Sequence, residues 1–566
     1  MLRLQIALLA AYLLLQIAPP AHAAAGTDFD LQGFIDRAIK AGHTKIVVPP
    51  GQYRVAPQGG VHLKLRNLKD IQILCDNVEM ICTQTCQAVG ISHCSNVWLR
   101  GLTVDYDPLP FSQGKVTALT PDKHIADVEL FEGYPGADSV GTFKYEIYRP
   151  DTRTLREDRG DASKVDMVDD RHVRVTGGGG RNSPVQIGDI VTLGASFPKG
   201  AGGHAFVIDN SANVKLDNID LFASPCFGFL EFDCDSIIYK RCRVDRRPAA
   251  TDPVHRGDPR IRSLDADAFH SSGALKGPSL IDCVARFMGD DAVNIHGSYQ
   301  MITACNGAEL RVLINGARLK QDEPVEMLTY QGVRLPDAVV TKVEPDNPMT
   351  PEEHAFLLKQ AMDRGLKNRT YNAYKITLDR AVELPVGSLI CSTKRIGNGF
   401  LVQGCDFGPN RSRGILIKAS DGQVIGNKLT GNWGEAIKVS PEYWWLESGS
   451  SINVVIKDNV ISDCITIPIA VYANGGTGKI APAGAHRSIT ISHNTISSCL
   501  LPYIAVTSTD GLVIEDNRCI LAPDAETHWA GGMLGLDRAK AEAIMTTECA
   551  NVTIKDNKIE REKAPQ

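Results

Sequence analysis

The sequence has few aromatic residues and no excess of basic ones. Aromatic side chains make up 6% of the 566 residues, and 60 Lys and Arg stand against 66 Asp and Glu, which gives a net charge of −6. Proteins that bind nucleic acid need a basic surface to neutralise phosphates and release counterions. The charge balance therefore argues against nucleic acid as a partner.

Long apolar runs are also missing. A membrane-spanning helix needs ~20 apolar residues, and even the run Leu4–Leu15 is too short for one. This run follows Arg3 and precedes a small-x-small site at 21–23, so residues 1–23 have the features of a cleaved signal peptide. We expect an exported protein without a membrane span, located in a bacterial periplasm or the medium.

Metal-binding cysteine patterns are absent as well. The chain has fifteen cysteines, but no CxxC pair stands at the spacing of a structural zinc site. A chain of this length buries a core without disulfide staples, so most cysteines are expected to be buried thiols that pack like small apolar groups. A disulfide is plausible only within the cluster of Cys75, Cys82, Cys86 and Cys94.

A short recurring phrase is the strongest pattern in the chain. Alternating apolar residues surround a polar pair that often ends in Asn, as in INVVIKDNVI at 452–461 and ANVTIKDNKI at 550–559. The alternation predicts a strand on each side of the pair, and Asp-Asn or Gly-Asn forms a corner that tolerates left-handed backbone. Equivalent positions lie 23 residues apart, as between Ile489 and Leu512.

A period near 23 residues with strands and no helices is typical of a right-handed parallel β-helix, in which each repeat forms one coil. The amphipathic run 29–42 predicts a capping helix at the N-terminal end. Two stretches, 105–200 and 309–395, contain alternating segments joined by turns, which predicts two inserted small β-domains of the barrel type. We favour a scaffold role for these two inserts over a role as loops that line the substrate site.

The fold class is therefore all-β, a capped parallel β-helix with two inserts. The expected boundaries are 1–23 for the signal peptide, 24–104 for the cap and first coils, 105–200 for the first insert, 201–308 for the coils with an Asp cluster, 309–395 for the second insert and 396–566 for the last coils.

The Asp cluster supplies the candidate catalytic residues. Asp267 precedes Asp290 by 23 residues and Asp291 by 24, one coil, so the carboxylates should stack on one face. Carboxylates that lie close together repel, and one is driven to hold a proton near neutral pH. Acid–base hydrolysis of a glycosidic bond requires two carboxyl groups whose pKa values differ in this way. Calcium binding or turn capping is the alternative interpretation.

Further polar residues fall near the same register. His270 and Asn294 each lie three residues after an aspartate of the stack, and the spacing of 20 between Lys418 and Lys438 predicts that these two stack as well. Aromatic rings beside charged groups, as at 443–447, suit a sugar ring. The candidate substrate-binding residues are His270, Asn294, His296, Lys418, Glu435, Lys438, Trp444 and Glu447.

These motifs resemble glycoside hydrolase family 110, the exo-acting α-galactosidases that remove terminal α-1,3-linked galactose. The likeness lies in DADAFH at 265–270, GDDAVNIHG at 289–297 and YWWLESGSSINVVIKDN at 443–459. The resemblance implies a galactose-terminated glycan as substrate and an inverting mechanism without metal or organic cofactor. It also implies that Asp290 is the general acid and that Asp267 and Asp291 hold the attacking water.

Inversion requires the acid and the base to lie about 6.5–9.5 Å apart across the substrate. Stacked coils are separated by only ~4.8 Å. We therefore expect the tips of the acid and base side chains to diverge.

Three alternatives stay open. Polygalacturonases are also inverting β-helix enzymes with an Asp and, one coil later, an Asp pair, and RGILIK at 413–418 is similar to their Arg-Ile-Lys, but their Gly-His-Gly element is absent from 305–320. A non-catalytic carbohydrate-binding β-helix is the second, although crowded carboxylates add little to binding alone. A calcium-assisted lyase is the third and weaker one. Association of β-helices through a flank, as a homo-oligomer, is also open.

Overall fold

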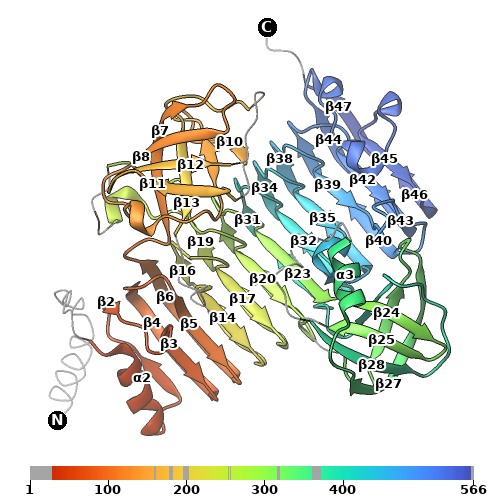
Figure 1. The fold of residues 1–566 in the computed structure, drawn as a ribbon, viewed down its shortest axis with the longest axis horizontal. Coiled ribbons are helices and arrows are strands. Elements are labelled where there is room, and N and C mark those ends of the chain that lie inside the picture. The colour runs from red at the N-terminus through yellow and green to blue at the C-terminus, as the bar shows by residue number, and fades with distance from the viewer. Residues whose placement is uncertain are drawn as a thin grey trace, which may run out of the picture.

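The computed structural model describes residues 29–562 apart from 159–160, 178–182, 196–202, 253, 255–256, 315–318 and 360–370. The predicted signal peptide, residues 1–23, lies outside the described residues. Figure 1 shows an elongated stack of parallel strands with two lateral domains, an orange one at the upper left and a green one at the lower right. No helix in the described part of the chain is long and apolar enough to cross a membrane.

The stack consists of two large parallel sheets, one of 22 strands and one of 12. In the larger sheet, β40 pairs with β43, and Ile489 lies in register with Leu512. Both side chains are fully buried, because alternate residues of each strand point into the coil. The predicted parallel β-helix is confirmed.

The larger sheet contains two ladders and the first two strands of the chain. The first ladder is β4 (Lys69–Cys82), β6 (Ser95–Tyr106), β15 (Lys215–Asp217), β18 (Ile238–Lys240), β21 (Ser279–Ile281), β30 (Leu401–Gln403), β33 (Gly422–Ile425), β37 (Ile452–Lys457), β40 (His486–Ser492), β43 (Thr509–Glu515) and β46 (Ala550–Lys555). The second runs from the end of β6 through β16 (Asp220–Leu221), β19 (Arg243–Val244), β22 (Val284–Ala285), β31 (Asp406–Phe407), β34 (Lys428–Thr430), β38 (Val460–Ser462), β41 (Thr495–Ser497) and β44 (Arg518–Leu521) to β47 (Lys558–Arg561). Strands β1 (Lys45–Val47) and β2 (Gly51–Val55) both pair with β4.

The smaller sheet carries the candidate site. Its strands, in spatial order, are β3 (Val61–Arg66), β5 (Gln87–Ser92), β14 (Phe206–Asp209), β17 (Phe229–Phe232), β20 (Phe269–Ser272), β23 (Val293–Ser298), β32 (Ile415–Ile417), β35 (Ile437–Val439), β39 (Ile469–Val471), β42 (Ile504–Thr507) and β45 (Ile544–Thr547), with β36 (Glu447–Ser448) paired to β23 off this path.

A column of asparagines builds the corner between the two ladders. Each asparagine donates from Nδ2 to Oδ1 of the next at 2.9 Å, and the first four members are buried. The preceding residue takes the left-handed conformation, as Asp458 does with φ 59°. The Asp-Asn corner therefore combines a residue that accepts this backbone with one that satisfies its neighbours. The column is Asn427, Asn459, Asn494, Asn517 and Asn557.

Helix α2 (Leu31–Lys40) covers the N-terminal end of the stack, as the amphipathic run predicted. It buries Leu31 and Ile35, and the Asp30 side chain accepts a hydrogen bond from the Gly33 N–H at its start. All fifteen cysteines are free thiols, including the cluster in which a bridge was considered. The core is therefore held by packing and hydrogen bonds.

The two inserts differ from each other. The second is a closed barrel, whereas the described strands of the first form an open antiparallel sheet and not the barrel that was predicted. The first contains β7 (Phe111–Leu119), β8 (Ile125–Leu130), β9 (Glu146–Tyr148), β10 (Leu155–Asp158), β11 (Lys164–Met167), β12 (His172–Thr176) and β13 (Ile190–Gly194). The second contains β24 (Gln300–Asn306), β25 (Glu309–Ile314), β26 (Pro324–Leu328), β27 (Arg334–Pro345), α3 (Pro351–Lys359), β28 (Asn372–Leu378) and β29 (Leu389–Ser392).

Candidate active site

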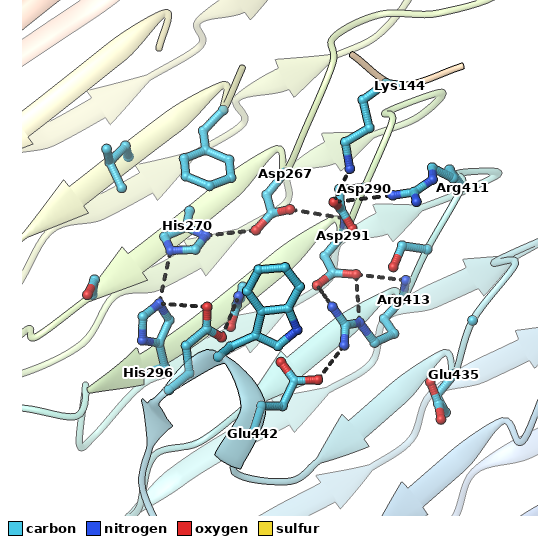
Figure 2. Close-up of a pocket in the computed structure, with 18 of the residues that line it drawn as sticks. Lys144, Asp267, His270, Asp290, Asp291, His296, Arg411, Arg413, Glu435 and Glu442 are labelled. Carbon is cyan, nitrogen blue, oxygen red and sulfur yellow. Dashed lines mark hydrogen bonds and ion pairs between the residues drawn. The ribbon is translucent and has the colours of Figure 1, made fainter. Parts of the chain in front are cut away.

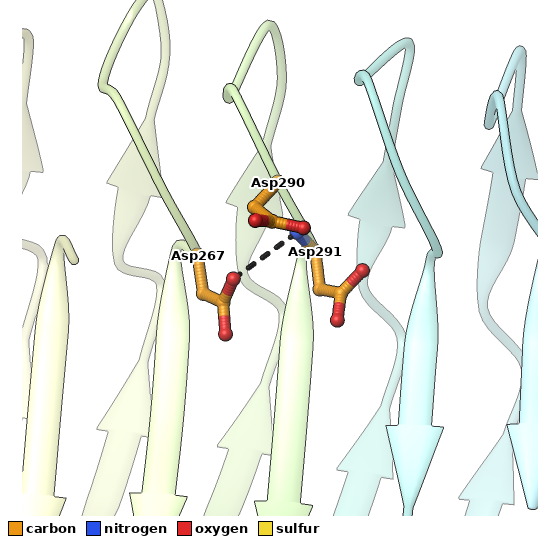
Figure 3. A group of neighbouring side chains, drawn as sticks. All are labelled: Asp267, Asp290 and Asp291. Carbon is orange, nitrogen blue, oxygen red and sulfur yellow. Dashed lines mark hydrogen bonds between the residues drawn. The ribbon is translucent and has the colours of Figure 1, made fainter. Parts of the chain in front are cut away.

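Three aspartates gather where two neighbouring strands begin. β20 and β23 pair in parallel, with His270 opposite Asn294, so the 24-residue spacing places Asp267 and Asp291 in the same register just before the strands. Figure 3 shows Asp290 beside them on the same edge. One oxygen of each of the three carboxylates lies within 4.8 Å of the others.

The nearest carboxylate oxygens do not diverge as the sequence analysis predicted. That prediction required about 6.5–9.5 Å between the acid and the base. In the structure, one oxygen of each carboxylate lies within 4.8 Å of the others. The reason is geometric, because neighbouring coils are only ~4.8 Å apart and Asp290 and Asp291 are consecutive. Hydrogen bonds to other coils then hold each carboxylate in place.

Asp290 lies between two cations that come from distant parts of the chain. Lys144 Nζ of the first insert donates to its Oδ2 at 2.5 Å, and Arg411 Nη1 donates at 3.3 Å (Figure 2). Burial would raise the pKa of this carboxyl, but Lys144, Arg411 and Arg413 hold it well below its usual range. Asp290 is therefore ionised in the ligand-free protein.

Asp291 is held by a guanidinium fork from the next coil. Arg413 donates from Nε to Oδ1 at 2.9 Å and from Nη2 to Oδ2 at 2.8 Å, and its Nη1 donates to Glu442 at 2.6 Å. Such bidentate pairs fix both the position and the plane of the carboxylate. The Asp291 side chain is 1% exposed and that of Asp290 is 25% exposed, so Asp290 is the carboxylate nearest to the open side.

Asp267 contacts a pair of histidines. His270 Nδ1 lies 2.7 Å from Asp267 Oδ2, and His296 Nε2 lies 2.9 Å from His270 Nε2. Burial, together with the charges of Asp291 and Asp290, raises the pKa of Asp267 to about 6. Burial would lower the pKa of His270, but the hydrogen bond to Asp267 raises it, whereas burial lowers the pKa of His296 to about 4.

These groups line one open pocket of about 1010 Å³. The first insert contributes Phe143, Lys144 and Asp161, and Trp445, which is 46% exposed, lines the same pocket. An exposed aromatic ring next to charged groups suits the C–H face of a sugar. The sequence-predicted residues that line the pocket are Asp267, His270, Asp290, Asp291, Asn294, His296, Glu435 and Glu447.

Lys418 and Lys438 do not line the pocket. Lys418 is fully buried, and its Nζ donates to Asn294 Oδ1 at 3.1 Å and to Glu447 Oε2 at 2.5 Å. The predicted stacking of the two lysines is wrong, because Lys438 lies opposite Leu416. The coil here has 22 residues and not 20. The two lysines therefore occupy different positions on their coils, and each contacts residues of the pocket from behind.

Trp444 does not line the pocket either. Its ring packs against Tyr443 with the centroids 5.4 Å apart, in an apolar cluster shared with the barrel. The short 3-10 turn at Tyr443–Trp445 points the two adjacent indoles to different sides. Trp445, which the sequence analysis did not single out, takes the place expected for Trp444.

The sequence analysis also missed the cations. Arg413 opens the RGILIK segment one coil after Asp291, so the repeat carried a signal for it once the second insert was set aside. Arg411 precedes it by two residues. Lys144 lies in the first insert, where no repeat relates a position to the coils, and no sequence pattern pointed to it.

The three aspartates have the spacing of a divalent cation site, since one oxygen of each lies within 4.8 Å of the others. Each carboxylate also contacts a protein group that can be positively charged: His270 for Asp267, Lys144 for Asp290 and Arg413 for Asp291. The chain itself therefore supplies positive charge at this cluster.

The pocket on this parallel β-helix combines a carboxylate cluster with a partly exposed tryptophan. The chain is 22% identical over 533 residues to alpha-1,3-galactosidase B of Bacteroides thetaiotaomicron, covering 88% of this chain and 79% of the relative. It is 21% identical over 556 residues to alpha-1,3-galactosidase A of Bacteroides fragilis, covering 87% and 84%. The resemblance to α-1,3-galactosidases is confirmed.

No protein-family model matches the chain. Among solved structures, the A-module of mannuronan C-5 epimerase AlgE4 from Azotobacter vinelandii aligns with a TM-score of 0.38 at 12% identity, covering 96% of this chain and 98% of that one.

Proposed function

We propose that the protein is an α-galactosidase that hydrolyses terminal α-1,3-linked galactose from glycans in a single inverting step. The observation that carries this proposal is the cluster of Asp267, Asp290 and Asp291 in one pocket, in a chain whose curated relatives are α-1,3-galactosidases. Two carboxyl groups in different environments are the minimum that glycoside hydrolysis needs.

Asp290 is the proposed general acid. Its side chain is the most exposed of the three, at 25% against 6% for Asp267 and 1% for Asp291. In an exo-acting enzyme the terminal sugar enters the pocket and the leaving group stays toward the opening, where Asp290 reaches the glycosidic oxygen. Lys144 and Arg411 hold the pKa of Asp290 below its usual range, which is the reverse of what a general acid needs. The assignment therefore rests on the exposure of Asp290 and on the family resemblance, and it requires the pKa of Asp290 to rise when substrate binds.

Asp267 and Asp291 are the proposed base and its partner. The Asp291 N–H donates to Asp267 Oδ1 at 3.3 Å. Because Arg413 holds both oxygens of Asp291, Asp267 is the one of the two proposed to bind the attacking water, and Asp291 positions it. The raised pKa of Asp267, about 6, is near the operating pH, and a general base is most effective under that condition.

The spacing of the carboxylates bears on stereochemistry. The nearest oxygens, within 4.8 Å, approach the ~5–5.5 Å spacing of retaining glycosidases. A retaining enzyme needs one carboxylate free to attack carbon. Both oxygens of Asp291 are held by Arg413 and Asp290 is held by Lys144, which leaves Asp267 as the carboxylate that could attack. Inversion is proposed because the resemblance implies it, and the spacing makes retention the alternative that the stereochemistry of the product decides.

Galactose release from galactosyl-α-1,3-galactose tests the proposal. The wild-type protein and an Asp458→Asn control, at a corner where the side chain is 48% exposed, should release galactose, and Asp290→Asn should release it about 10³-fold more slowly. Activity on polygalacturonate instead would move the protein to the polygalacturonase alternative. Binding without turnover of either substrate would support a carbohydrate-binding module.

We also propose that the protein acts after export. The support is the signal-peptide pattern of residues 1–23. N-terminal sequencing of the protein from cell fractions tests this proposal. A chain that still begins at Met1 and is found only in the cytoplasm would contradict it.

A further inference from the structure

A chain of three hydrogen bonds leads from the catalytic pocket to the backbone. Asp267 Oδ2 lies 2.7 Å from His270 Nδ1, His270 Nε2 lies 2.9 Å from His296 Nε2, and His296 Nδ1 lies 2.6 Å from the carbonyl oxygen of Gly297. Figure 2 shows the contacts running from the Asp267 carboxylate to His270 and then turning to His296. All three side chains are buried or nearly so, so water does not replace these contacts.

The proton count of this chain follows from its last acceptor. A carbonyl oxygen only accepts, so His296 Nδ1 must carry a hydrogen. The contact between the two Nε2 atoms needs one hydrogen, and the contact between His270 and Asp267 needs another. Three hydrogen bonds therefore require three protons, while two neutral imidazoles supply two. The third is an extra proton held by the chain.

The extra proton belongs to the pair nearest the substrate. Burial makes a charged His296 unfavourable, whereas the contact with Asp267 favours a charged His270. The His270 ring also stacks on Phe227, with the centroids 4.2 Å apart and the planes 14° from parallel, an arrangement that stabilises a cationic ring. The groups whose charges act on His270 are Asp267, His296, Glu447, Lys418, His204 and Glu231.

We infer that Asp267, His270 and His296 hold one extra proton as a unit, and that His296 is a positioning residue that keeps this proton on the Asp267–His270 pair. If the proton left, two lone pairs would face each other at one of the three contacts. Shifting the hydrogens along the chain only moves this repulsion, because the carbonyl of Gly297 cannot donate.

This inference concerns the base of the proposed reaction. It rests on the proposed function only in the experiment that measures turnover. A base formed by Asp267 beside a charged His270 works while the pair holds one proton. A second proton would occupy the base, and loss of the first would leave two lone pairs facing each other at one of the three contacts and loosen the position of Asp267. Activity should therefore fall at high pH when the proton leaves, and His296 should set where that happens.

The first test measures the proton directly and needs no turnover. In the full-length protein labelled with ¹⁵N-histidine, with resonances assigned from single variants, both nitrogens of His270 should be protonated at about pH 7.5, one unit above the ordinary pKa of histidine. His296 should be protonated only at Nδ1. A His270 protonated only at Nδ1 in the wild-type protein at this pH would mean that the chain holds no extra proton and would overturn the inference, whether or not the protein is a galactosidase.

The second test uses His296→Leu, which removes the acceptor, and His296→Gln, whose amide oxygen restores one. On 4-nitrophenyl α-galactoside, the basic limb of the kcat/KM profile should move down by about one pH unit in His296→Leu and stay close to wild type in His296→Gln. The matched control is His486→Gln, since His486 is a buried histidine held by Tyr472 O and Ser451 N outside the pocket.

The outcomes separate the two claims. An unmoved basic limb in His296→Leu would overturn the inference even if the protein is an active galactosidase. If neither the wild type nor any variant turns over the substrate, the proposed function fails. The ¹⁵N spectra alone then decide the inference. Where His296→Leu does not fold, the wild-type spectrum at about pH 7.5 gives the same decision.

Discussion

Lys144 Nζ lies 2.5 Å from Asp290 Oδ2, although 146 residues separate the two in the chain. Lys144 belongs to the first insert and Asp290 to the central coils, and the lysine side chain is only 10% exposed. Phe143 and Asp161 of the same insert line the pocket as well. The first insert is therefore part of the site and not the plain scaffold that the sequence favoured.

Removal of this lysine should impair catalysis without unfolding the protein. Lys144→Met deletes the charge-assisted hydrogen bond that orients Asp290, and a misplaced catalytic group costs about 10–100-fold in rate. We expect kcat/KM on galactosyl-α-1,3-galactose to fall by that factor with Tm unchanged. The control is Lys164→Met in the same insert, whose side chain is 67% exposed. Equal activity of the two variants would contradict the role of Lys144.

The acid and the base should differ in their dependence on the leaving group. A nitrophenol leaves without protonation, so Asp290→Asn should lose about 10³-fold on the disaccharide and far less on 4-nitrophenyl α-galactoside. Asp267→Asn removes the base and should lose activity on both substrates. Kinetics of the two variants on the two substrates check this. The opposite pattern would exchange the roles of Asp267 and Asp290.

The acidic limb of the pH profile should report Asp267. Burial raises the pKa of this carboxyl to about 6, and the proposed base works only when it is ionised. The value of kcat/KM should therefore fall about tenfold per unit as the pH drops below about 6. Measurement on 4-nitrophenyl α-galactoside between pH 4 and 7 checks this. A flat profile down to about pH 4.5 is incompatible with the assignment.

A buried glutamate beside the site should make stability depend on pH. Glu231 accepts hydrogen bonds from Ser271 Oγ at 2.6 Å and Tyr239 OH at 3.1 Å, and burial raises its pKa to about 7. Because the unfolded chain ionises this group at lower pH, its contribution favours folding at low pH and is lost as the pH rises through 7.

Glu231→Gln removes the free-energy cost of burying an ionised carboxylate at high pH. The variant should gain about 1–3 kcal/mol of unfolding free energy at pH 8, and the gain should shrink as the pH approaches 4.5. Denaturant unfolding at the two pH values measures the difference. Glu526→Gln is the control, since that side chain is 63% exposed. A gain of equal size at both pH values would mean that ionisation of Glu231 is not the cause.

The asparagine column should also contribute to stability. Asn494→Ala leaves the buried amide groups of Asn459 and Asn517 without their partner, which costs about 2–3 kcal/mol. Thermal unfolding beside Asn372→Ala, an exposed position on the barrel, isolates the effect. A loss no larger than that of the control would show that the column is not needed for stability.

The repeat made part of the site predictable. The 24-residue register that stacks Asp267 on Asp291 also sets His270 opposite Asn294, and both pairs could be read from spacing alone. The pairing of Lys418 with Lys438 failed because coils vary in length, and the one between β32 and β35 has 22 residues. Lys144 could not be found, since the path of an insert back to the coils depends on packing that no period encodes.

Proton NMR of the anomeric region, recorded while the protein acts on galactosyl-α-1,3-galactose, distinguishes the two stereochemical courses. Under single-step inversion β-galactose is formed first and later equilibrates, and Asp290→Asn forms no detectable product over the same minutes. Initial α-galactose would contradict single-step inversion and make one of the aspartates a nucleophile. No galactose at all would contradict the proposed function.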